Sequence, residues 1–169
     1  MSMSSNELHK NIVKKFFEKR KRISKGFPSP EFVGYLSHSG EKYSLKDFRG
    51  QYLYIDIWAT WCAPCIREIP YLKSVQKMYK DSSKITFLNI SIDNPKEDFE
   101  KWKRMVRKKE LGGVSLIADN MKKSDFIADY VVTGLPRFIL IDPQGYIVSP
   151  NAPRPSDPDL IELFIQEGI

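Results

Sequence analysis

A chain of 169 residues is long enough to bury a hydrophobic core and most simply forms one domain. Its composition, 41% hydrophobic and 28% charged, is ordinary for a globular protein, and no run of about eighteen apolar residues predicts a membrane-spanning helix. The net charge of +6 resides in residues 1–26, where eight Lys or Arg face two Glu, because the other 19 basic and 19 acidic residues balance. This distribution argues against a globular body that binds nucleic acid.

Residues 1–26 are expected to form a basic helical segment or linker, distinct from a domain spanning residues 27–169. Their apolar side chains recur near one helical face, with lysines opposite: Leu8, Ile12, Val13, Phe16 and Phe17. The simpler expectation is that this stripe packs on the globular body or continues an upstream domain. The alternative is that the helix docks on an anionic membrane or partner. Phe27-Pro28-Ser29-Pro30 breaks any helix and marks the start of the domain.

A β-hairpin and a short helical turn are predicted for residues 31–51. Phe32 and Tyr35-Leu36 supply the first strand, and residues 42–44 supply the returning strand. Leu45-Lys46-Asp47-Phe48 then leads to Gly50, a residue type that commonly follows a helix end.

The next segments predict a parallel crossover. Residues 52–58 form a nearly continuous apolar run, which is typical of a strand covered on both faces. Residues 63–80 have the apolar period of a helix, and residues 85–92 form a second buried strand. A strand, helix and strand joined at this spacing predict a right-handed connection.

The second half of the chain predicts two more helices, a hairpin and a terminal helix. Asn94-Pro95 has the residue types of a helix start, and Gly112-Gly113 would end that helix. A short strand at 114–117 and a helix at 124–130 follow. Residues 137–141 and 145–148 flank a Pro- and Gly-containing turn and form a hairpin, and a last helix begins after Asp157-Pro158.

Trp61-Cys62-Ala63-Pro64-Cys65 holds the only two cysteines, at the predicted junction between strand 52–58 and helix 63–80. Disulfide exchange needs an attacking thiolate and a second thiol that resolves the mixed disulfide. Cys62 precedes the helix, so its sulfur can face unpaired backbone N–H groups and the positive end of the helix dipole, which favour the thiolate. Cys65 lies one turn further in. We therefore predict that Cys62 is the nucleophile and Cys65 the resolving thiol.

Two other uses of the cysteine pair are weaker. A structural zinc site usually needs four Cys or His ligands, and only His9 and His38 remain, far along the chain. A purely structural disulfide that closes so short a loop would constrain the chain little. No metal or organic cofactor is expected for the redox reaction.

The stretch from Asp56 through Trp61-Cys62-Ala63-Pro64-Cys65, followed by Gly134-Leu135-Pro136, resembles the thioredoxin superfamily. The N-terminal hairpin, Glu68 three residues after the second cysteine, and a helix and strand inserted before Gly134 resemble the TlpA-like thiol-disulfide oxidoreductases of bacterial envelopes more closely. The resemblance spans roughly residues 28–167. It implies an α/β thioredoxin fold, with a central mixed sheet flanked by helices, an N-terminal β-hairpin and a helix-strand insertion before a cis-proline.

The resemblance also implies roles for two carboxylates. Asp56 stands where thioredoxins bury a carboxylate behind the cysteines. In an apolar strand its pKa should be raised, which suits proton transfer to and from Cys65. Glu68 matches the acidic residue near the active site of TlpA-like reductases. The alternatives are a hydrogen-bonded structural carboxylate for Asp56 and a solvated helix residue for Glu68.

Four further residues are implied to contact the substrate. Pro136 would be the cis-proline beside the dithiol, and it would present the backbone of Leu135 to an extended polypeptide. Trp61 is expected to be an exposed docking surface. Arg137 occupies a position where thioredoxins commonly have Thr, and we expect its charge to lie near Cys62 and favour the thiolate; the alternative is a solvated surface residue.

The predicted function is a thiol-disulfide oxidoreductase that reduces protein disulfides and is recycled by an upstream thiol-disulfide electron donor. One alternative is a thiol peroxidase of the peroxiredoxin group, although Ala59 stands where that group usually has Thr. Another is a non-enzymatic redox-sensing binding module. We expect a monomer with no nucleic-acid partner, located in the bacterial periplasm or cell envelope. A cytoplasmic location is the alternative, since the sequence shows no signal peptide.

Overall fold

The computed structural model describes residues 5–169 and is built on one mixed β-sheet. Its seven strands lie in the order β2-β1-β5-β4-β3-β6-β7. The strands are β1 (Tyr35–Ser37), β2 (Lys42–Tyr43), β3 (Tyr52–Trp58), β4 (Ile85–Ser91), β5 (Val114–Ile117), β6 (Arg137–Ile141) and β7 (Ile147–Ser149). The helices are α1 (Ser5–Arg22), α2 (Ala63–Met78), α3 (Phe99–Lys108), α4 (Asp125–Asp129) and α5 (Asp159–Gln166), with 3₁₀ turns η1 (Leu45–Phe48) and η2 (Met121–Lys123).

The centre of the sheet is β3, which is paired on both sides. It runs parallel to β4 over its whole length, from Tyr52 opposite Ile85 to Trp58 opposite Ser91. On its other side it is antiparallel to β6. The predicted crossover through α2 and the mixed thioredoxin-type sheet are therefore confirmed.

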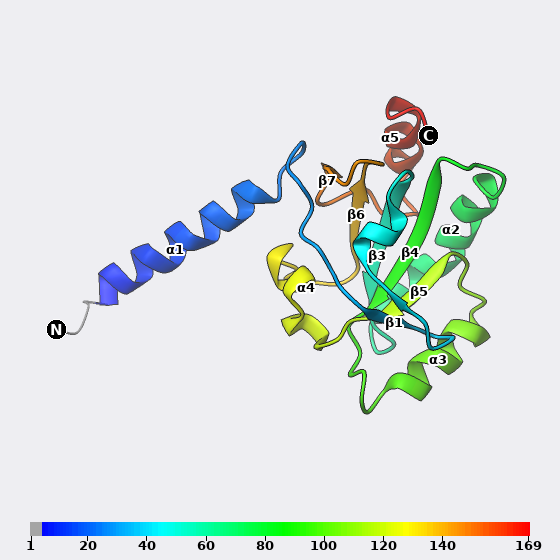
Figure 1. Ribbon diagram of the computed structural model, residues 1–169, viewed down its shortest axis with the longest axis horizontal. Helices are drawn as coiled ribbons and strands as arrows, with labels where there is room; N and C mark the ends of the chain where they lie inside the picture. Colours follow the sequence, from blue (N-terminus) through cyan, green and yellow to red (C-terminus); the bar gives the residue numbers. More distant parts are fainter. Residues whose placement is uncertain (1–4) are drawn as a thin grey trace.

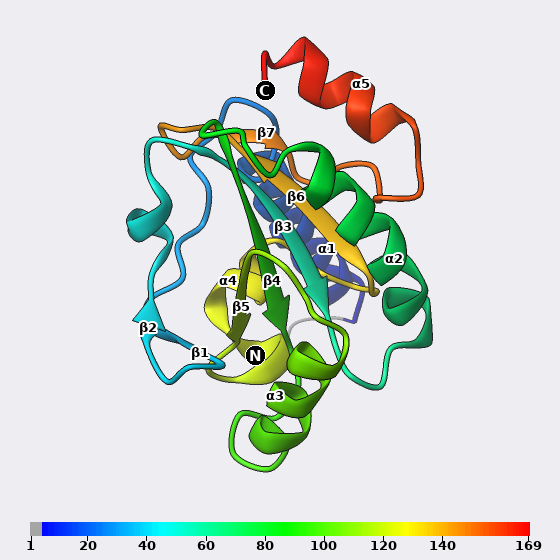
Figure 2. The same cartoon turned by 90° about the vertical axis from the view of Figure 1, so that its right-hand side faces the viewer.

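Side chains of β3 contribute to two separate cores, which explains its apolar sequence. Leu53, Ile55 and Ile57 belong to a core shared with α3 and α4. Tyr54 faces the opposite core, where it packs with residues of α2 and α5. Figure 2 shows these two helices on the same side of the sheet. Because a strand buried on both faces cannot shift register without exposing apolar surface, β3 has a fixed position beneath α2.

The α3 helix begins later than its sequence predicts. We expected Asn94 to cap it, but α3 begins at Phe99. Asn94 instead accepts hydrogen bonds at its side-chain oxygen from the backbone N–H groups of Lys96 and Glu97. The side-chain hydrogen bonds expected of a helix cap thus stabilise a separate turn that precedes α3. The hairpin prediction also included Phe32, which lies before β1 and stacks on Tyr35 with ring centroids 4.8 Å apart.

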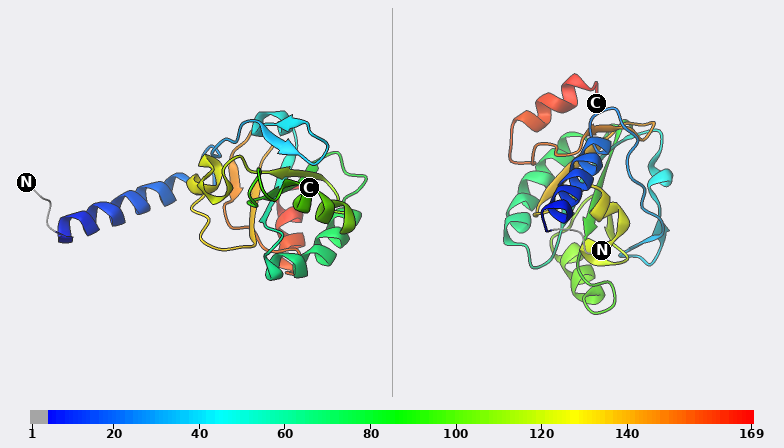
Figure 3. Two further views of the ribbon diagram at one scale, coloured as in Figure 1. Left: turned by 90° about the horizontal axis from the view of Figure 1, so that it is seen from below. Right: turned by 90° about the vertical axis from the view of Figure 1, so that its left-hand side faces the viewer.

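The α1 helix projects from the body (Figures 1 and 3). Its expected apolar stripe does not pack on the domain: Phe17, for example, is 66% exposed. Only the end of α1 nearest the domain is attached. Ile23 is buried just after it, and Lys19 forms an ion pair of 3.0 Å with Asp129 of α4. Within residues 5–169, no helix combines the length and apolar character needed to cross a membrane.

Candidate active site

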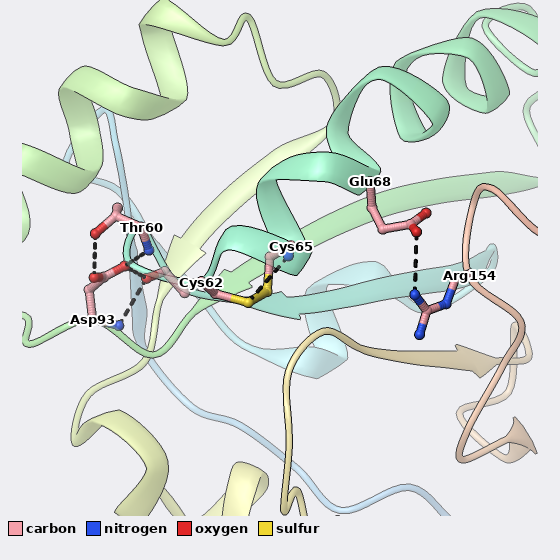
Figure 4. Close-up of a disulfide and its surroundings, with 7 residues drawn as sticks. Thr60, Cys62, Cys65, Glu68, Asp93 and Arg154 are labelled. Carbon is pink, nitrogen blue, oxygen red and sulfur yellow. Dashed lines mark hydrogen bonds and ion pairs between the residues drawn. A yellow bond between two sulfur atoms is a disulfide. The ribbon is translucent and has the colours of Figure 1, made fainter.

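Cys62 and Cys65 form a disulfide at the N-terminus of α2 (Figure 4). Cys62 is the N-cap residue, and its sulfur accepts a hydrogen bond from the backbone N–H of Cys65 at 3.2 Å. This contact confirms that the sulfur of Cys62 faces the unpaired donors of the first helical turn. A negative charge on that sulfur would be stabilised by the same donors and by the helix dipole.

A groove of about 560 Å³ opens beside Cys62. Trp61, Pro64, Val132 and Leu135 are among the residues that line it. Trp61 is 63% exposed, as predicted, whereas Trp58 is buried in the core. Cys62 itself is largely buried and lines this groove, and the apolar walls suit a polypeptide rather than a small hydrophilic ligand.

The peptide bond between Leu135 and Pro136 is cis, which confirms the prediction for Pro136. It lies between the groove and the first residue of β6. Since β6 pairs directly with β3, the sheet itself sets the position of Leu135 relative to the strand that leads to Cys62.

Asp56 is buried in β3, and its Oδ1 has no hydrogen-bond partner among the described residues. Burial, and secondarily the negative charge of Glu68, raises the pKa of this carboxyl to about 8. The raised pKa expected for Asp56 is therefore confirmed. The alternative, a structural carboxylate held by hydrogen bonds, is not supported at Oδ1. At pH 7 the carboxyl group of Asp56 is mostly protonated, and it loses the proton as the pH rises through about 8.

Glu68 is also buried, so the alternative of a solvated helix residue is wrong. Ser156 donates to its two carboxylate oxygens from the backbone N–H at 3.0 Å and from the hydroxyl at 2.8 Å. Arg154 approaches it at 3.5 Å (Figure 4). The segment between β7 and α5 thus supplies partners that no local sequence pattern indicates.

Asp93 is a buried residue near the dithiol that the sequence analysis missed. Its carboxylate accepts hydrogen bonds from the backbone N–H of Thr60 at 2.9 Å and from the Thr60 hydroxyl at 2.7 Å (Figure 4). Ser91 donates a third at 2.5 Å. Thr60 follows β3 and Asp93 follows the parallel strand β4, so their adjacency at one sheet edge was the available signal. Asp93 fixes the backbone that leads into Cys62.

Two basic residues have unexpected positions. Lys122 lines the groove beside Cys62, although nothing in the sequence indicated it. Arg137 donates from Nε to the carbonyl of Pro150 at 2.7 Å and lines a different cavity, next to α1. It is partly buried, which is not the solvated position considered as the alternative. Its expected influence on Cys62 stays a prediction.

Comparison with known proteins finds one sequence family and several relatives that are named as thiol-disulfide oxidoreductases or as thioredoxin-like. The sequence model of the Redoxin family matches residues 24–160. The chain is 29% identical to the thiol-disulfide oxidoreductase ResA of Geobacillus kaustophilus, covering 80% of this chain and 74% of that protein. It is 31% identical to the thioredoxin-like protein YneN of Bacillus subtilis, covering 81% and 76%.

Solved structures agree with this. The thioredoxin domain of a thiol-disulfide oxidoreductase from Bacteroides vulgatus has a TM-score of 0.73 at 28% identity, covering 85% of this chain and 97% of that one. A thiol-disulfide oxidoreductase from Bacteroides fragilis has a TM-score of 0.70 at 28% identity, covering 84% and 99%.

Proposed function

This chain belongs to the Redoxin family and is a thiol-disulfide oxidoreductase, and from that premise we propose that it reduces disulfides in proteins. The observation that carries the proposal is the disulfide of Cys62 and Cys65 at the start of α2, beside an apolar groove. That groove gives a polypeptide access to the first of the two sulfurs.

The reduction proceeds by two exchanges. The Cys62 thiolate attacks a substrate disulfide, forming a mixed disulfide and releasing one substrate thiolate, which takes up a proton. The Cys65 thiolate then attacks the sulfur of Cys62, and the second substrate thiolate leaves. Two electrons have passed to the substrate, and the pair is left as the disulfide seen in this structure. An upstream dithiol donor must reduce it again.

Asp56 and Glu68 serve the second exchange. Cys65 must lose its proton to attack and regain one when the pair is reduced. Asp56, with a pKa of about 8, can accept or supply that proton at neutral pH. Glu68 acts through Asp56, because its charge helps to hold the proton there.

Trp61, Leu135 and Pro136 form the substrate surface in this proposal. Trp61 offers an exposed apolar face, and Leu135, which lines the same groove, would pair through its backbone with an extended chain. The protein acts as a monomer in the bacterial periplasm or cell envelope, as its resemblance to TlpA-like oxidoreductases suggests.

The test separates the two cysteines. Reduction of a peptide disulfide is measured with dithiothreitol as the donor. Cys62→Ala should abolish reduction, whereas Cys65→Ala should accumulate a mixed disulfide between Cys62 and the peptide, visible by mass spectrometry. Wild-type turnover in the Cys62 variant would refute the mechanism. The reduction potential of the pair tests direction: a value near that of thioredoxin, about −270 mV, supports a reductase, and one near −120 mV an oxidase.

A further inference from the structure

A second groove of about 530 Å³ lies between α1 and the body. Phe16 and Phe17 line it from α1, and Tyr130 lines it from the segment after α4. It adjoins the groove beside Cys62, because Thr133 contributes to the walls of both. A chain bound at Cys62 can therefore continue into this second space.

The second groove is cationic and lacks any compensating acid. Arg20, Lys21 and Arg137 line it, and none of its described lining residues is acidic. None of these three cations forms an ion pair within residues 5–169. Arg20 lies over the Phe16 ring at 5.5 Å, and both burial and the charge of Arg20 lower the pKa of Arg137. Positive charges held together in this way attract a carboxylate and repel a basic chain.

Contacts at the C-terminal end of α1 attach the helix to the domain beside the groove. Ile23 is buried in the core, and the backbone N–H of Gly26 donates to the carbonyl of Ile147 at 2.8 Å. The ion pair between Lys19 and Asp129 links α1 to α4. These contacts attach the end of α1 from which Phe16, Phe17 and the basic side chains line the groove.

We propose that this second groove binds acidic residues flanking the disulfide of the polypeptide substrate, so that the protein prefers acidic over neutral disulfide polypeptides. The inference rests on the proposed reductase function. Its occupant is the substrate chain, because the two grooves share Thr133 and none of the three cations has an acidic partner within residues 5–169. The aromatic rings would cover the apolar parts of the same segment.

The test uses two synthetic peptides with the same disulfide, one flanked by Glu residues and the other by Gln residues. We expect kcat/KM for the Glu peptide to exceed that for the Gln peptide by about tenfold at low ionic strength, and the ratio to fall towards one above ~0.5 M salt. The double variant Arg20→Gln and Lys21→Gln should lower the ratio at least threefold. Lys10→Gln, an exposed change on α1 outside the groove, should leave the ratio unchanged.

Equal rates for the two peptides in the wild type would overturn the inference while leaving the reductase function intact. A preference that survives in the Arg20 and Lys21 double variant would also overturn it. If neither peptide is reduced by the intact dithiol, the proposed function fails and the inference fails with it. Equal rates combined with sedimentation of the protein on anionic, but not neutral, phospholipid vesicles would assign the basic face of α1 to a membrane instead.

Discussion

The buried carboxyl of Asp56 should make the stability of the oxidised protein strongly dependent on pH. Its pKa is about 8 in the folded chain, against ~3.9 in an unfolded one. Between pH ~4 and ~8 the folded state therefore keeps a proton that the unfolded state has lost. The protonated Asp56 therefore contributes its full stabilisation of the folded state only below the pKa that it has in the unfolded chain. As the pH rises from ~4 to ~8, the free energy of unfolding falls.

The size of the effect follows from the two pKa values. Each unit of difference corresponds to about 1.4 kcal/mol, so the full loss attributable to Asp56 is about 6 kcal/mol. That is comparable to the whole folding free energy of a small domain, which is about 5–15 kcal/mol. Asp56→Asn removes the ionisation while keeping the shape of the side chain, and it should abolish this part of the pH dependence.

The measurement is urea unfolding of wild type and Asp56→Asn from pH 4 to 9, with the disulfide intact. The difference in unfolding free energy between the two proteins should grow with pH, the variant becoming the more stable. Asp81→Asn is the matched control, because Asp81 is exposed and its replacement should leave the wild-type profile unchanged. Parallel profiles for wild type and Asp56→Asn would refute the burial argument.

Two further outcomes concern the surroundings of the dithiol. Asp93→Asn should lower the unfolding free energy by about 2–4 kcal/mol, since one acceptor oxygen is replaced by a donor facing Thr60 or Ser91. It should also slow peptide reduction about tenfold, and wild-type rates would show that Asp93 does not position Cys62. Trp61→Ala should change the unfolding free energy by less than about 0.5 kcal/mol, because the ring is exposed. KM for an unfolded protein disulfide should nevertheless rise several-fold, whereas Tyr71→Ala, another exposed aromatic change, should not alter it.

The dithiol and its helix were predictable because their determinants are local. Cys62 and Cys65 lie three positions apart, and the apolar run of β3 followed by the period of α2 places them at a helix start. The cis state of Pro136 was expected only from the family motif, since the sequence of an X-Pro bond does not by itself select the isomer.

The partners of the buried carboxylates could not be predicted, because they are set by tertiary packing. Glu68 meets Ser156 across 88 positions of the chain. Asp93 meets Thr60 across 33 positions. Likewise, periodicity predicts that α1 is amphipathic but does not determine whether its apolar side is covered, and that side proved to be largely exposed.

Asp56 of β3 and Glu68 of α2 are both buried acids, but their partners differ. Glu68 receives two hydrogen bonds from Ser156 and the charge of Arg154, all from the chain segment after β7. The Oδ1 atom of Asp56 has no hydrogen-bond partner among the described residues, and the negative charge of Glu68 adds to the rise in the Asp56 pKa. Two negative charges in one buried site repel each other, so the proton stays on the acid with fewer partners. The fold thereby assigns the proton to Asp56, in the strand that leads directly to Cys62.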